Sequence, residues 1–208
     1  MEIIAETADE LEPQQLLSAV GACRRNLGYT SMTAFAELLR SKLAGNESPA
    51  ASGLRSKALY ELHMAVYQQG DAAQGLYQRS MELAEQSAQE ARKAGDPCGA
   101  LFALMNVSGL LLPKMGKWEE GLTLSERVSA EAEALAADAP DDEVRKRPLR
   151  VAMNCYFHRI DILVKNSGRK GAVEALLAKL EANVVYRAGK EQDWSRQYVE
   201  AAQRYISF

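Results

Sequence analysis

Apolar residues recur along this chain at steps of three and four, the spacing that places side chains on one face of an α-helix. The clearest run lies within Asp71 to Ala94, about six turns, and its apolar positions are Ala73, Leu76, Tyr77, Met81, Ala84, Ala88 and Ala91. No segment combines strict two-residue alternation with the β-branched residues that are typical of strands. The pattern therefore predicts an all-α fold.

Breaks in the helical pattern divide the chain into segments. Gly95-Asp96-Pro97 is typical of one helix ending and the next beginning, since glycine ends helices, aspartate caps them and proline fits the first turn. Ala139-Pro140-Asp141 predicts a second capped break, and residues 45–53 read as a surface loop. The predicted helical hairpins span about 14–44, 54–94, 97–137 and 142–189, followed by a final helix at about 193–206.

Glycines occupy the expected turns between consecutive helices at Gly28, Gly70, Gly116 and Gly168, with separations of 42, 46 and 52 residues. Each glycine follows one apolar helix and precedes another, so the chain reads as a series of helix–turn–helix hairpins. A single hairpin cannot bury its apolar face alone, and the hairpins must therefore stack on one another.

The stretch 105–121 carries a more specific pattern, with Met105, Gly109, Leu112 and Gly116 at steps of four, three and four, followed by Trp118 and Gly121. This pattern resembles the tetratricopeptide repeat (TPR). The other hairpins match less of it, because His63 and Asp161 stand where a small residue is expected. The separations exceed the usual repeat of about 34 residues, so the resemblance is to the longer-helix, TPR-like variety.

The resemblance implies one domain over residues 1–208, a right-handed superhelix of stacked antiparallel hairpins with a C-terminal capping helix. An unrelated helical bundle is the alternative. In TPR-like arrays the first helix of each hairpin lines a concave groove. The residues that match groove positions are Arg25, Lys57, Tyr60, Met64, Tyr67, Asn106, Lys114, His158 and Lys165.

The predicted groove set holds four cations, one histidine, two tyrosines and no carboxylate. Such a surface would suit an extended peptide or helix that carries acidic groups and one or two apolar anchors. The other interpretation is that these residues are ordinary surface lysines and buried tyrosines.

Charge and cysteine content narrow the classes of partner and compartment. The chain has 25 Lys and Arg against 28 Asp and Glu, a net charge of −3, without the basic surplus of a nucleic-acid binder. The longest apolar run, residues 107–113, is too short to span a bilayer, so no membrane association is expected. An odd number of widely spaced cysteines, three in all, favours reduced thiols and a cytoplasmic protein.

Catalytic and metal-binding constellations do not emerge from the sequence. Cys155 and His158 lie three residues apart on one predicted helix, but no second ligand pair completes a metal site. No phosphate-binding loop, nucleophile elbow or acid pair with a base is found.

The expected function is a non-enzymatic protein-binding or peptide-binding adaptor without a cofactor. The alternative is a regulatory sensor that binds a small peptide and switches a partner protein. The apolar C-terminus, Ile206 and Phe208, would serve either as one more packed turn or as a homodimer contact.

Overall fold

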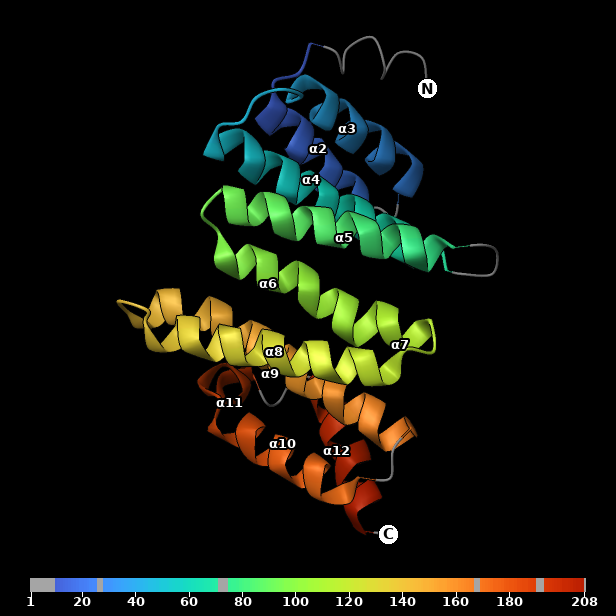
Figure 1. Ribbon diagram of the computed structural model, residues 1–208, viewed down its shortest axis with the longest axis vertical. Coiled ribbons are helices and arrows are strands. Elements are labelled where there is room, and N and C mark those ends of the chain that lie inside the picture. The colour runs from blue at the N-terminus through green and yellow to red at the C-terminus, as the bar shows by residue number, and fades with distance from the viewer. Residues whose placement is uncertain (1–9, 26–27, 71–74, 167–168, 190–192, 208) are drawn as a thin grey trace. The chain divides into compact units, whose positions relative to one another are not determined.

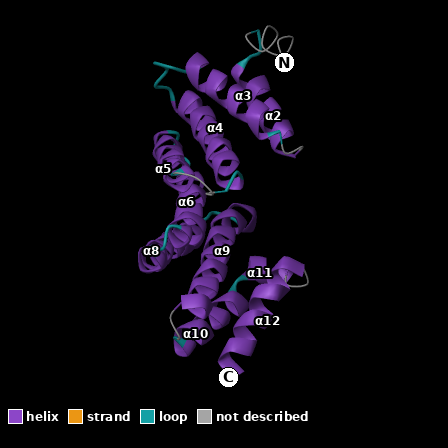
Figure 2. Cartoon of the chain, turned by 90° about the vertical axis from the view of Figure 1, so that its right-hand side faces the viewer, coloured by secondary structure: helices purple, strands orange, loops and turns teal. Residues whose placement is uncertain are grey.

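The computed structural model describes residues 10–25, 28–70, 75–166, 169–189 and 193–207, of which positions 25, 189, 193–198 and 201 are described by their backbone alone. Helices make up 86% of the described residues, and no strand occurs among them (Figure 2). The prediction of an all-α chain is confirmed. The chain divides into two compact units, residues 1–103 and 104–208, which are described separately below. Organisation as one TPR-like domain stays a prediction.

The first unit contains four consecutive helices and the start of a fifth. They are α2 (Pro13–Arg25), α3 (Tyr29–Lys42), α4 (Pro49–Gln68), α5 (Leu76–Lys93) and α6 (Pro97–Asn106), the last of which crosses the boundary between units (Figure 1). Helices α2, α3 and α4 pack against one another, and α5 packs along α4. Their shared core includes the fully buried Leu16, Met32 and Leu39. Burying each such side chain contributes about 1.5–3 kcal/mol.

Helix α4 begins at Pro49, five residues before the predicted start of the second hairpin at residue 54. The Ser48 hydroxyl accepts a hydrogen bond from the amide of Ala51, and Pro49 occupies the first turn. A serine cap followed by proline is a helix start signal, so the interpretation of residues 45–53 as a loop was wrong beyond Ser48.

A polar seam holds α4 against α5. The hydroxyl of Ser56 donates to the carbonyl of Ser87, and the hydroxyl of Ser87 donates back to the carbonyl of Ser56, at 2.9 and 2.8 Å. Two turns further along, the Ser80 hydroxyl donates to the carbonyl of His63 and lies 2.9 Å from His63 Nδ1. Since the Ser80 proton is committed to that carbonyl, Nδ1 of the neutral imidazole is the donor to Ser80 Oγ. All four side chains are buried and satisfied.

The predicted break at Gly95-Asp96-Pro97 is confirmed in detail. Gly95 adopts a φ of 73°, and the amide of Asp96 donates to the carbonyl of Ala91, which closes helix α5. The carboxylate of Asp96 then accepts a hydrogen bond from the amide of Gly99 at 2.8 Å and caps α6.

Helix α6 continues into a π-helical turn, η1 (Val107–Leu111), and a short α7 (Leu112–Lys114). The sequence indicated a bend near Pro113. The structure places the irregularity one turn earlier, because Pro113 has no N–H to offer the carbonyl four residues before it. The helix widens into i→i+5 bonding at this point. The hydroxyl of Ser108 bonds the carbonyl of Met105 within this segment.

The second unit is built around the long helix α9 (Asp142–Asn166). Helix α8 (Trp118–Ala137) packs along α9, and both contact η1. Helix α10 (Lys170–Ala182) and α12 (Asp193–Ser207) pack on α9 and on each other. A helix thus occupies the predicted position at 193–206 and packs on α9 and α10. The side chains of its Trp194 and Tyr198 lie outside the described residues.

The predicted single helix over 170–188 is divided at Asn183 into α10 and α11 (Val184–Gly189). The side-chain oxygen of Asn183 accepts hydrogen bonds from the amides of Val185 and Tyr186, and its amide group donates to the carbonyl of Leu149. This cap starts a new helix with a different orientation of its side chains, and Val184, its first residue, is 45% exposed.

Two glycines shape the turn and the crossing between η1 and α8. Gly116 closes α7 with a φ of 76°. A β-carbon on Gly121 would lie 2.6 Å from the backbone oxygen of Ser108, so the helices cross closely there. Trp118, expected to be largely buried, is partly exposed. The predicted turn glycine Gly168 lies outside the described residues.

One stretch, Pro97–Lys114, is long and apolar enough to cross a membrane by length and composition, and 56% of it is buried. This test uses the mean hydropathy of all 18 residues. The sequence argument against a membrane span used only the length of the apolar run 107–113. Core helices of soluble proteins pass the same test, so a single such helix is weak evidence for a span. The absence of membrane association stays a prediction.

Candidate functional site

Four of the predicted groove residues share one face of α4. Lys57, Tyr60, Met64 and Tyr67 follow one another at steps of three, four and three, which keeps them on a single stripe of the helix. Lys57 is exposed and the other three are partly buried. The Tyr60 ring meets the buried His63 edge-on, with centroids 5.5 Å apart. The Tyr67 ring packs on that of Tyr77 of α5, with centroids 5.9 Å apart, so Lys57 is the most exposed member of this stripe.

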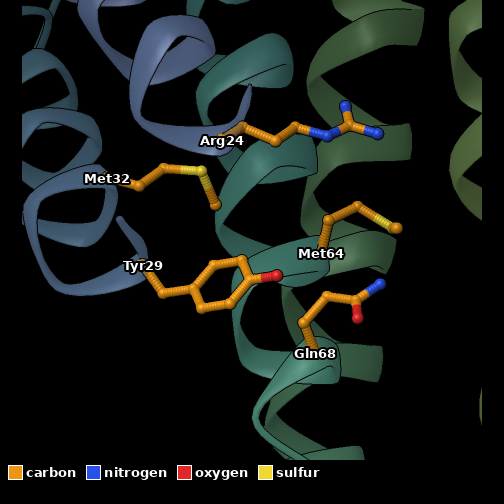
Figure 3. A pocket seen from close by; sticks show the side chains of 5 residues that line it. All are labelled: Arg24, Tyr29, Met32, Met64 and Gln68. Atoms are coloured by element: carbon orange, nitrogen blue, oxygen red, sulfur yellow. The ribbon is translucent and has the colours of Figure 1, made fainter. Parts of the chain in front are cut away.

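A pocket of about 200 Å³ opens beside this stripe in the first unit. Its walls come from the end of α2, the start of α3 and the last turns of α4 (Figure 3). Met32 is fully buried and forms an apolar wall, while Met64 is partly exposed. In Figure 3 the Met32 side chain and the Tyr29 hydroxyl extend toward α4. The lining residues are Arg24, Tyr29, Met32, Met64 and Gln68.

Arg24 stands at the rim of the pocket in a fixed orientation. Its Nη1 donates to both carboxylate oxygens of Glu61, at 3.0 and 3.2 Å. The side chain of Arg24 is 45% exposed and that of Glu61 is 18% exposed. Within the described part of the chain, Nε and Nη2 of Arg24 make no protein hydrogen bond. The ion pair therefore holds the guanidinium while leaving its other edge open.

His63 lies behind the stripe and is part of the structural seam with Ser80. Burial, and to a smaller extent the positive charge of Arg24, lowers the pKa of His63 from 6.5 to about 4. The imidazole is thus neutral at pH 7 and has its Nδ1 proton engaged by Ser80. This environment suits a packing role in the hairpin and not acid–base chemistry near neutral pH.

Apart from Arg25, the remaining groove candidates belong to the second unit. Asn106 is 4% exposed, whereas Lys114 on α7 is exposed. Lys165 is exposed and its Nζ binds the Asp161 carboxylate of the same helix at 2.8 Å. The side chain of Arg25 lies outside the described residues, so its position in the groove stays a prediction, as does the groove as a whole.

His158 packs directly on Gly109 of the π turn. A β-carbon on Gly109 would overlap the imidazole, lying 2.6 Å from the His158 β-carbon. Its Nδ1 is buried and has no hydrogen-bond partner among the described residues. Burial lowers the pKa of His158 to about 4, against the opposing effect of the Asp161 carboxylate. His158 is therefore a neutral wedge between α9 and η1.

No family model, curated protein or solved structure matches the chain. The likeness to TPR proteins accordingly rests on the residues of the hairpins alone, and the site has to be interpreted from its own chemistry.

Metal-binding and nucleophilic groups do not gather at any of these positions. Among the described residues, no group of three or more His, Cys, Asp or Glu side chains is placed to hold a metal ion. Burial raises the pKa of the Cys155 thiol to about 12, so this cysteine is a thiol and not a thiolate at neutral pH.

Four pocket residues were missed by sequence reasoning, which considered only the first helix of each hairpin. Tyr29 and Met32 lie on a second helix, α3, and Gln68 lies one position beyond the chosen stripe. Arg25 was selected where Arg24 lines the pocket. A signal for Arg24 existed, since Leu16, Val20 and Arg24 recur every four residues and the first two are fully buried.

Proposed function

We propose that this protein is a non-enzymatic peptide-binding module, an adaptor whose α2–α3–α4 pocket receives one apolar side chain of a partner. The observation that carries the proposal is the pocket itself. Its volume of about 200 Å³ is below the ~300–1,000 Å³ typical of sites for drug-sized ligands and cofactors. A single anchoring side chain from a peptide or protein is a better match in size, and such anchors dominate the affinity of interfaces.

The composition of the pocket supports a peptide ligand. Met32 and Met64 supply a polarizable apolar lining, and methionine adapts its shape to varied partners. Tyr29 and Gln68 add neutral hydrogen-bonding groups of the kind that bind peptide backbone. The adjacent α4 stripe of Lys57, Tyr60 and Tyr67 extends the same surface beyond the pocket.

We further propose that the two units together form a TPR-like right-handed superhelix of stacked hairpins, acting in the cytoplasm on a protein partner. The close crossing at Gly121 and the glycine-closed turn at Gly116 support the hairpin arrangement. Free cysteines at Cys23, Cys98 and Cys155 support a reducing compartment.

The proposal is tested by selecting 12-residue peptides from a random displayed library on the purified chain, then measuring their affinity by fluorescence anisotropy. Met64→Glu should weaken the selected peptides at least about tenfold, because it places a charge in the apolar pocket. Met81→Glu is the matched control, since Met81 is partly exposed on α5 and is not a pocket residue. Selected peptides that bind both variants as well as the wild type would exclude this pocket as the site.

A further inference from the structure

Arg24 presents an unused hydrogen-bonding edge beside the apolar pocket. Both contacts with Glu61 use Nη1, so no described residue of the chain takes up the three N–H groups on Nε and Nη2. Nε and Nη2 together form the planar fork that matches the two oxygens of a carboxylate. The side chain of Arg24 is 45% exposed and lines the pocket, so a ligand seated there meets this residue.

Glu61 prepares this edge for binding. An arginine side chain loses considerable rotational freedom when a ligand fixes it, and that loss weakens binding. Here Glu61 already fixes the guanidinium before any ligand arrives, with its carboxylate only 18% exposed. The remaining pocket residues are uncharged, namely Tyr29, Met32, Met64 and Gln68. Selectivity for ligand charge within the described pocket therefore resides in Arg24.

We propose that the pocket selects peptides in which the apolar anchor is flanked by an aspartate or glutamate, whose side-chain carboxylate is bound by Nε and Nη2 of Arg24. This inference rests on the proposed function and adds the class of partner sequence: an acidic residue beside an apolar one. Lys57 reinforces the preference, since it is exposed on the same α4 stripe seven residues, or about 10 Å along the axis, from Met64.

The test uses peptides selected from the library described above. Each is synthesised in its original form and in a form with the flanking Asp or Glu changed to Asn or Gln, which keeps the shape and removes the charge. On the wild-type chain the acidic form should bind about tenfold tighter. On Arg24→Gln the two forms should bind within about twofold of each other, and salt should weaken only the wild-type preference.

Arg79→Gln provides the control for loss of one positive charge, because Arg79 is exposed on α5 and is not a pocket residue. It should leave the acidic preference intact. Should Arg24→Gln lower the melting temperature, Arg24→Lys keeps the pairing with Glu61 but lacks the fork, and the preference should then fall to a few-fold.

The outcomes separate this inference from the proposed function. Equal binding of acidic and neutral peptides, with Met64→Glu still disruptive, would overturn the role of Arg24 and leave the pocket as the peptide site. Peptides that lose binding when their C-terminus is amidated, and not when the flanking acid is neutralised, would also overturn it in favour of a terminal carboxylate. Binding unaffected by Met64→Glu would overturn both proposals.

Discussion

The imidazole of His158 occupies the space that a β-carbon on Gly109 would require. Gly109 lies in the middle of the π turn of η1, and His158 lies in the second half of α9. The two elements approach so closely only because one of the facing residues has no side chain. Gly109 stands at a small-residue position of the TPR-like pattern. The space beside it is filled by the His158 side chain of α9.

Replacing Gly109 with alanine should destabilise the chain by about 1–3 kcal/mol through overpacking against His158. Chemical denaturation followed by circular dichroism measures this. Gly171→Ala is the control, because a β-carbon there meets nothing within 4 Å. It should be neutral or stabilising by up to about 1 kcal/mol.

The contact can be isolated by the double variant Gly109→Ala/His158→Ala. Its loss of stability should be smaller than the sum of the single losses by about 1 kcal/mol or more, because the clash arises only when Gly109 is replaced while His158 is still present. Additive losses would show that Gly109 matters for the backbone of the π turn and not for the histidine.

Gly121→Leu should destabilise the chain by about 1–3 kcal/mol, because the new side chain meets the Ser108 carbonyl and Pro113. The Ser108 carbonyl belongs to the backbone and cannot rotate away as a side chain can, so the backbone of η1 would have to shift. Ala130→Leu adds comparable bulk at an exposed position of the same helix and should change stability by less than about 0.5 kcal/mol. A neutral Gly121→Leu would contradict the close crossing. Differential scanning fluorimetry suffices for the comparison.

Stability should fall with acidification through the pKa of His63. Burial lowers this pKa from 6.5 to about 4 in the folded chain, so the unfolded chain binds more protons between those values. The free energy of unfolding is therefore retained above about pH 6.5 and lost as the pH falls toward 4, by roughly 2 kcal/mol at pH 5 from this group.

The titration itself can be followed by NMR, with the two histidine resonances assigned through single variants. His63 should titrate near pH 4, and a midpoint near 6.5 would contradict its burial in the α4–α5 seam. In His63→Gln the loss of stability between pH 7 and pH 5 should be smaller than in the wild type by roughly the same 2 kcal/mol.

Asn183→Ala should cost about 1–2 kcal/mol, since it removes the cap of α11 and the hydrogen bond to Leu149. The expected effect is measured by urea denaturation. Asn166→Ala serves as the control, because the exposed Asn166 bonds, among the described residues, only to the carbonyl of Ile162 in its own helix. It should change stability by less than about 0.5 kcal/mol.

Helix positions were largely predictable because start and stop signals are local. Asp96 and Pro97 specify the start of α6 from adjacent residues, and the structure confirms this break. Asn183 was missed because its effect depends on Leu149, more than 30 residues away, which the sequence pattern does not place nearby. The innermost face of α3 carries Met32 and Ala36, which are fully buried, while Phe35 and Leu38 are only partly so.

The candidate site was predictable only where it follows one helix. Lys57, Tyr60, Met64 and Tyr67 share one face of α4 because residues at steps of three and four on one helix lie together, and their role in binding stays a prediction. The pocket joins three helices, and its Tyr29 and Met32 reach it through tertiary packing. Arg25 was selected instead of Arg24. Adjacent residues point about 100° apart around a helix, so an error of one position selects a different face of α2.

The serine–histidine seam between α4 and α5 restricts how the first unit can move. Each hydroxyl is bonded to a carbonyl of the opposite helix, at positions two turns apart on both helices. Sliding one helix past the other by a single turn would strand these buried groups without partners. These buried hydrogen bonds therefore favour a single register between α4 and α5. The pocket also touches α2 and α3, which take no part in these bonds, so we expect any rearrangement on ligand binding to involve α2 and α3.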